Sequence, residues 1–138
     1  MWKSFWKGYI QAMAFTAHRE TVDANGEYDS DSLFEDKQFS EFDIKRIHEV
    51  LSVETILDLQ EDCVQFLVQV QELYVESFEE FDIPWEQVGS DFHLSRNGHG
   101  AGFFDRDYQG LENQLQEMAR VWGTCELVCE DQTYQIRN

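Results

Sequence analysis

Residues 53–80 read VETILDLQEDCVQFLVQVQELYVESFEE, the longest uninterrupted helical pattern in this chain of 138 residues. Apolar side chains recur every three or four residues there, as on the buried face of an amphipathic helix. Ser52, directly before the stretch, is a favourable N-cap residue. The spacing therefore predicts one long helix, whose buried stripe comprises Ile56, Leu59, Cys63, Phe66, Leu67, Val70, Leu73, Tyr74 and Phe78.

The opposite face of this expected helix is acidic. At about 100° per residue, four carboxylates near its start share one side, and four more follow eighteen residues later, which is five full turns. The two clusters therefore lie on the same face, about 27 Å apart at about 1.5 Å per residue. This candidate partner-binding face comprises Glu54, Asp58, Glu61, Asp62, Glu72, Glu76, Glu79 and Glu80.

Nothing on this helix offsets the carboxylates, because no lysine or arginine occurs from Ile47 to Ser95. Like charges one turn apart destabilise a helix. A segregated field of one sign also attracts partners of the opposite sign. The face is therefore predicted to bind a cationic partner, with an ordinary solvated helix face as the alternative.

The net charge of −18 arises in one part of the chain. Residues 20–91 hold 21 acidic and three basic residues, whereas the remainder holds seven of each. Direct binding to nucleic acid is not expected, because phosphates would be repelled and no basic patch is present in the sequence. The expected partner is instead a basic protein surface.

Length and composition fit one domain over residues 1–138. A hydrophobic fraction of 42% and an aromatic fraction of 14% argue against disorder despite the charge. The sequence has no apolar run long enough for a transmembrane span, and the opening MWKSFWKGYIQAMAF lacks the continuous apolar core of a signal sequence. The cysteines Cys63, Cys125 and Cys129 form no CxxC pair and fit free thiols in a reducing cytosol.

Residues 1–89 are predicted to form a mainly helical, acidic half. Aromatic and apolar residues recur at helical spacing from Trp2 to Met13, which predicts a helix packed in the core, with a membrane-surface helix as the alternative. A further short helix is expected from Ser40, which resembles a capping residue, through about Leu51.

Residues 21–40 are polar and predict an irregular connection. Their alternating carboxylates resemble a calcium loop. Counted from Asp23, however, positions 6 and 12 hold Tyr28 and Phe34 in place of the required glycine and glutamate. A solvated acidic loop without bound metal is therefore expected.

Residues 90–138 are predicted to form a ββαββ half. Phe92 and Leu94 alternate with polar residues, and Asn97-Gly98 is a strong hairpin-turn signal. A return strand is expected at about 101–105. The strands are therefore expected to form a hairpin over residues 92–105.

The remainder of this half predicts one helix and a second hairpin. Helical spacing runs from Tyr108 to Val121, and the closing strands are expected at 127–128 and 134–136. Helices followed by strands indicate an α+β fold. We expect an N-terminal helical region packed against a small C-terminal antiparallel sheet, with two hairpins flanking one helix.

The segment SRNGHGAGFFDRD, residues 95–107, is the most distinctive local motif. A catalytic interpretation makes His99 a general base oriented by Asp105 or Asp107. The structural alternative, which we favour, is a tight hairpin whose glycines let a helix pack closely. The alternative site comprises Arg96, Asn97, His99, Asp105 and Arg106.

The longer segment DFHLSRNGHGAGFFDRD, residues 91–107, resembles a motif of small bacteriophage proteins that is often written DFWLTRNGHGAGFWDR. His93, Ser95 and Phe104 depart from that motif. The similarity extends over the following helix and the closing hairpin, which is about the last third of the chain. The resemblance implies a bacteriophage context and carries no mechanism.

The acidic face and the phage resemblance together predict a phage-encoded acidic inhibitor in the host bacterial cytoplasm. It would mimic the charge of DNA and block a basic, nucleic-acid-binding host or defence protein, such as a restriction enzyme or a CRISPR effector. No enzymatic activity, cofactor, metal ion or membrane partner is expected. The alternative is a small enzyme or nucleotide-binding domain that uses the segment RNGHGAGFFDRD.

Overall fold

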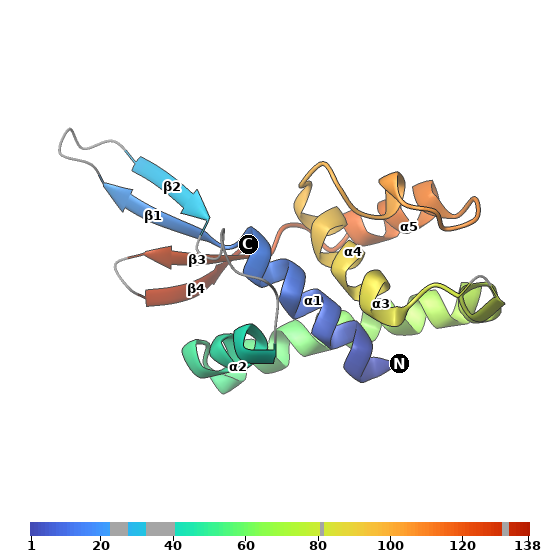
Figure 1. Ribbon diagram of the computed structural model, residues 1–138, viewed down its shortest axis with the longest axis horizontal. Coiled ribbons are helices and arrows are strands. Elements are labelled where there is room, and N and C mark those ends of the chain that lie inside the picture. The colour runs from blue at the N-terminus through green and yellow to red at the C-terminus, as the bar shows by residue number, and fades with distance from the viewer. Residues whose placement is uncertain (23–27, 33–40, 81, 131–132) are drawn as a thin grey trace.

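A computed structural model describes residues 1–22, 28–32, 41–80, 82–130 and 133–138 (Figure 1). The architecture is α+β, as the sequence predicts, with helices gathered on one side and a small sheet projecting from them (Figure 1). The elements in chain order are α1 (Trp2–Thr16), β1 (His18–Val22), β2 (Tyr28–Ser32), α2 (Glu41–Val50), α3 (Val53–Glu80), α4 (Trp85–Asn97), the 3-10 turn η1 (Phe103–Asp105), α5 (Glu112–Arg120), β3 (Glu126–Glu130) and β4 (Thr133–Arg137).

The sheet has the strand order β2-β1-β3-β4. The closing hairpin of β3 and β4 is antiparallel, as predicted, with Glu130 opposite Thr133. The irregular connection expected over 21–40 is wrong in part, because β1 and β2 form an antiparallel hairpin there. β1 then pairs in parallel with β3, His18 opposite Val128, so the N-terminal hairpin extends the C-terminal one into a single mixed sheet.

The hairpin predicted over residues 92–105 is also wrong, and with it the ββαββ order. α4 continues through Asn97, because Val88, Phe92 and Ser95 follow helical spacing and are buried on one face. Gly98 adopts the left-handed conformation with φ 67° and ends the helix. Asn97-Gly98 is therefore a helix C-terminus and not a two-residue turn.

α1 lies in the centre of the core, as predicted, and Phe5, Tyr9, Ile10 and Met13 are fully buried. Its aromatic rings meet those of the long helix and of α4, where Phe66 stacks on Phe92 with ring centroids 4.0 Å apart. Within the described residues, no helix combines the length and the apolarity needed to cross a bilayer.

The buried stripe predicted for α3 is largely confirmed. Leu59, Cys63, Phe66, Leu67 and Val70 are buried, and Ile56 packs partly against the core. Leu73 is an exception because 56% of it is exposed. The side chains of Tyr74 and Phe78 lie outside the described part of the structure.

A glycine on each helix, Gly8 on α1 and Gly89 on α4, lets the two helices cross with their backbones in contact. A Cβ atom on Gly8 would overlap the backbone oxygen of Glu86, and one on Gly89 would overlap that of Phe5. No side chain fits at either position without moving a helix. Neither glycine belongs to the motif of residues 95–107, in which Gly98 and Gly100 face open space and Gly102 packs closely against Ser95.

Replacing Gly89 with alanine tests the crossing. In an ordinary helix interior this change stabilises by about 1 kcal/mol. Here overpacking against Phe5 is expected to lower the free energy of unfolding by about 2 kcal/mol. Urea denaturation measures the difference, with Ser90→Ala in the next position as the control. An unchanged or raised stability of Gly89→Ala would show that the helices do not touch.

Candidate functional site

The outer face of α3 presents carboxylates to solvent. The helix begins at an N-cap in which Ser52 Oγ accepts a hydrogen bond from the backbone N–H of Thr55 at 3.1 Å. From there Glu54, Asp58 and Glu61 are exposed in the first three turns, and Glu72 is exposed farther along. We call these four residues the acidic stripe.

No basic group neutralises the acidic stripe within the described residues. The arginine–carboxylate pairs between described side chains join Arg96 to Asp62 and Arg106 to Asp91, and His99 lies beside Glu126. Among the described residues, the one side-chain hydrogen bond to the stripe comes from a neutral donor, from Gln65 Nε2 to Glu61 Oε1 at 3.2 Å. Among the described residues, the acidic stripe therefore faces solvent without a basic partner.

Asp62 was expected on this exposed face but does not belong to it. Its Oδ2 atom pairs with Nη1 of Arg96 at 3.1 Å, and only 33% of its side chain is exposed. Four residues before buried Phe66, Asp62 lies only about 40° from it around the helix and therefore turns toward α4. The last three predicted carboxylates, Glu76, Glu79 and Glu80, belong to α3, but their side chains lie outside the described residues.

Arg96 of the motif is a structural centre and does not face solvent. Its side chain is 3% exposed. In addition to pairing with Asp62, Nη1 of Arg96 donates a hydrogen bond to Tyr9 Oη at 3.1 Å. Its Nε atom donates to the carbonyl oxygen of Gly123 at 2.9 Å, and its Nη2 atom donates to the carbonyl oxygen of Trp122 at 3.3 Å. One guanidinium therefore joins α1, α3, α4 and the turn after α5.

Asn97 and Asp105 also act within the fold. Asn97 Nδ2 donates to the carbonyl oxygens of His93 and Cys125, and its Oδ1 accepts from the backbone N–H of Cys125 at 2.6 Å. Asp105 Oδ1 accepts from the backbone N–H of Gly102 at 2.8 Å, which caps the start of η1. These contacts hold neighbouring segments together, but the tight hairpin expected for the motif is replaced by the end of α4 and the turn η1.

His99 does not pair with either predicted aspartate. Asp105 holds Gly102, and Asp107 accepts from Gln109. The carboxylate beside His99 is Glu126, with Nε2 and Oε1 2.8 Å apart but without the alignment of a hydrogen bond. Sequence analysis missed Glu126 because it comes from β3, far from the motif along the chain.

Arg106 is held by a buried acid. Its Nε donates to Asp91 Oδ1 at 2.7 Å, while Tyr108 Oη donates to Asp91 Oδ2 at 2.6 Å. Burial raises the pKa of Asp91, and the hydrogen bond from Tyr108 and the charge of Arg106 act against that rise. The guanidinium of Arg106 is partly exposed, with 44% of the side chain accessible.

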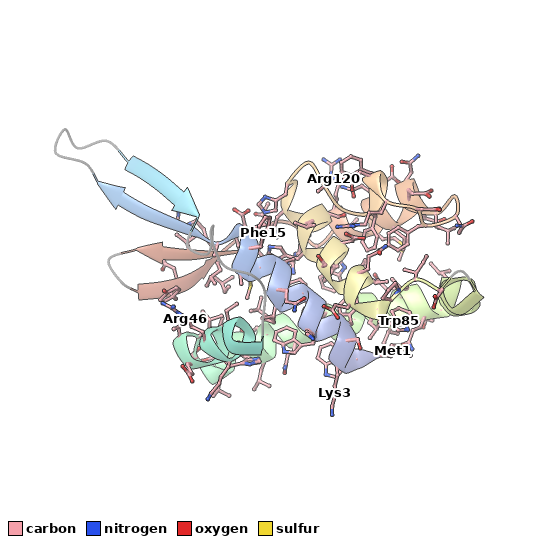
Figure 2. All side chains as sticks on the ribbon, viewed as in Figure 1. Met1, Lys3, Phe15, Arg46, Trp85 and Arg120 are labelled. Carbon is pink, nitrogen blue, oxygen red and sulfur yellow. The ribbon has the colours of Figure 1, made fainter. Side chains whose placement is uncertain are left out.

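His99 and Arg106 border a cavity of about 450 Å³ between α1, α4 and the turn that follows α4. Phe15, in the last turn of α1 (Figure 2), and Leu94 supply apolar walls. Ser90 and Thr16 contribute hydroxyl groups to the lining. The described residues contain no cluster of three or more groups suited to a metal ion.

Comparison with protein-family models, curated proteins and solved structures finds no match to this chain. The geometry of the chain's own residues therefore carries the functional argument.

His93 is fully buried beneath the cavity. Its Nε2 lies 2.8 Å from Thr16 Oγ1, and its ring meets Tyr9 edge-on. Burial lowers the pKa of His93 well below its ordinary value of 6.5, and the nearby His99 and Arg96 lower it further. The imidazole is therefore neutral at pH 7.

The lowered pKa of His93 makes folding dependent on pH. Because the folded-state pKa lies below the unfolded one, the contribution to stability is complete above about pH 6.5 and is lost as the pH falls below it. Below about pH 6.5, uptake of this one proton by the unfolded chain lowers the free energy of unfolding by up to about 1.4 kcal/mol for each pH unit. Replacing His93 with glutamine is expected to reduce this slope in denaturant titrations. Equal slopes for the variant and the parent protein would contradict the assignment.

Proposed function

We propose that this protein is a phage-encoded, non-enzymatic inhibitor that acts in the host bacterial cytoplasm. It binds a basic, nucleic-acid-binding surface of a host or defence protein through the acidic stripe and thereby displaces DNA. The single observation that carries the proposal is the exposure of the stripe's carboxylates without a basic partner among the described residues. The phage setting rests on the resemblance of residues 91–107.

The physical role of the acidic stripe is electrostatic complementarity. Glu54 and Glu72 take the same angle on α3 and lie about 27 Å apart along its axis. Carboxylates spaced over such a length offer negative charge to lysine and arginine side chains that otherwise hold phosphates. Complementary fields raise the association rate and weaken as salt is added.

The pairing of the two arginines of the motif also supports inhibition over DNA binding. Arg96 is buried and satisfied, and Arg106 is tied to Asp91. The strongly acidic segment would repel a duplex. Competition for a protein that binds DNA is therefore the favoured mode of action.

A charge variant tests the proposal directly. The charge variant combines Glu54→Gln, Asp58→Asn and Glu61→Gln. Because each exposed charge contributes a few tenths to about 1 kcal/mol to binding, the variant should bind its target about tenfold more weakly at low salt. DNA-binding proteins captured from host lysate at low salt serve as targets, and displacement of a fluorescent duplex from each target is the measurement. Loss of affinity should appear mainly in the association rate and shrink at high salt.

Matched controls separate this face from total charge and from the motif. Glu49→Gln, Asp82→Asn and Glu117→Gln remove three charges from other exposed positions and should change displacement less than twofold. His99→Ala should also leave it nearly unchanged. Normal displacement by the charge variant combined with failure of His99→Ala would refute the proposal.

The second candidate function is binding of a small molecule, such as a nucleotide, in the cavity beside His99. The cavity of about 450 Å³, bordered by His99, Ala101 and Arg106 of the motif, favours it. Ala101→Phe fills the cavity without removing a polar group.

A thermal-shift titration with nucleotides tests this candidate. Saturating ligand at about one hundred times its Kd should stabilise the parent protein by about 2.7 kcal/mol and leave Ala101→Phe unaffected. Absence of any shift, or an equal shift in both proteins, would remove this candidate.

A further inference from the structure

α3 carries exposed apolar residues directly beside the acidic stripe. Val53 is 76% exposed, Leu57 58%, Val64 44% and Val68 45%. Their intervals of four, seven and four residues place them within an arc of about 60° around the helix. We call these four residues the apolar seam.

The apolar seam borders the acidic stripe along the helix. At about 100° per residue, the seam and the stripe each cover an arc of about 60°, and a gap of only about 20° separates the two arcs. A surface that mimicked phosphates by charge alone would not require exposed aliphatic side chains beside the acidic stripe. The exposed surface of α3 is therefore amphipathic, with its own apolar and charged sides.

A second copy of the chain is a poor partner for this surface. Two copies packed along their seams would bring two acidic stripes together, and each chain has a net charge of −18. Like charges placed across an interface oppose association and are not balanced by lysine or arginine on α3. The complementary occupant is apolar along one side and cationic beside it.

We propose that the apolar seam and the acidic stripe together bind a basic amphipathic helix of the partner protein. Helices recognise such surfaces by setting an apolar face into a seam while charged side chains beside it select orientation and partner. Leucine or isoleucine side chains of the partner contact Leu57 and Val64, and its lysines or arginines pair with Asp58 and Glu61. From Val53 to Val68 the seam extends about 22 Å, which matches an occupant of about four to five turns.

This inference rests on the proposed function and narrows it. The target must present a helix with an apolar ridge within its cationic surface. A flat phosphate-binding surface without such a ridge would bind less tightly. Specificity then comes from the seam, whereas the stripe supplies charge attraction.

Two synthetic peptides of about 18 residues, with identical leucine, lysine and alanine composition, provide the probes for an occupant of that length. In the amphipathic peptide the leucines share one helix face with lysines beside them, and in the scrambled peptide they are spread around the helix. Fluorescence anisotropy measures the binding of each peptide to the full-length chain. We expect the amphipathic peptide to bind at least tenfold more tightly than the scrambled one.

Three variants assign the result to the surface. Leu57→Gln, Val64→Gln and Val68→Gln together should abolish the preference for the amphipathic peptide. Val121→Gln removes an apolar side chain that is 87% exposed elsewhere and should preserve it. The charge variant of the acidic stripe should weaken both peptides. Because all these positions are exposed, urea denaturation should confirm that each variant is folded.

The outcomes separate this inference from the proposed function. Equal binding of the two peptides to the parent protein, or a preference that survives in the seam variant, overturns the seam as a docking site. If the charge variant still weakens both peptides in that case, the acidic stripe stands. If the charge variant binds both peptides as the parent protein does, both proposals fail.

Discussion

The buried guanidinium of Arg96 sets the relative positions of most of the helices. A charge removed from water must be paired and hydrogen-bonded, or it costs several kcal/mol. Arg96 meets this requirement with oxygens from α1, α3 and the turn after α5, and its Cζ atom lies 5.3 Å from the centroid of the Phe92 ring. Because removing any one of these segments would leave hydrogen-bonding groups unpaired, the segments are held together around this side chain.

The need to pair buried Arg96 separates residues that hold the fold together from the exposed acidic residues of α3. The motif residues Arg96, Asn97 and Asp105 direct their polar groups inward and satisfy backbone groups of neighbouring segments. On its exposed face, α3 turns the carboxylates of the acidic stripe outward with no pairing base among the described residues. The motif residues therefore stabilise the fold, whereas the acidic residues of α3 carry the proposed interaction.

Helical periodicity predicted α1, α2 and α3 well, because apolar spacing over about ten or more residues leaves little ambiguity. It placed the start of α5 at Tyr108, four residues before the observed start at Glu112. It failed at α4, where a short alternation around Phe92 and the turn signal of Asn97-Gly98 competed with helical spacing. The hairpin of β1 and β2 was missed because its sequence is polar and because β1 pairs with β3, which lies near the other end of the chain.

The acidic stripe followed from helix geometry alone, since the angles of Glu54, Asp58 and Glu61 depend only on their spacing. The inward turn of Asp62 depends on Arg96, and the pairing of His99 depends on Glu126, so neither follows from local sequence. The apolar seam escaped notice because valine and leucine on a helix are ordinarily assigned to its core. Exposure becomes apparent only when the packing of α1 and α4 is known.

Hydrogen–deuterium exchange of the chain, alone and in complex with a captured DNA-binding partner, tests most directly whether α3 is the binding surface. We expect slower amide exchange in α3 from Val53 to Leu73 when the partner is bound. Exchange from Arg96 to Arg106 should be unchanged. Slower exchange around His99 and Arg106 with no change in α3 would contradict the assignment and move the binding site to the motif.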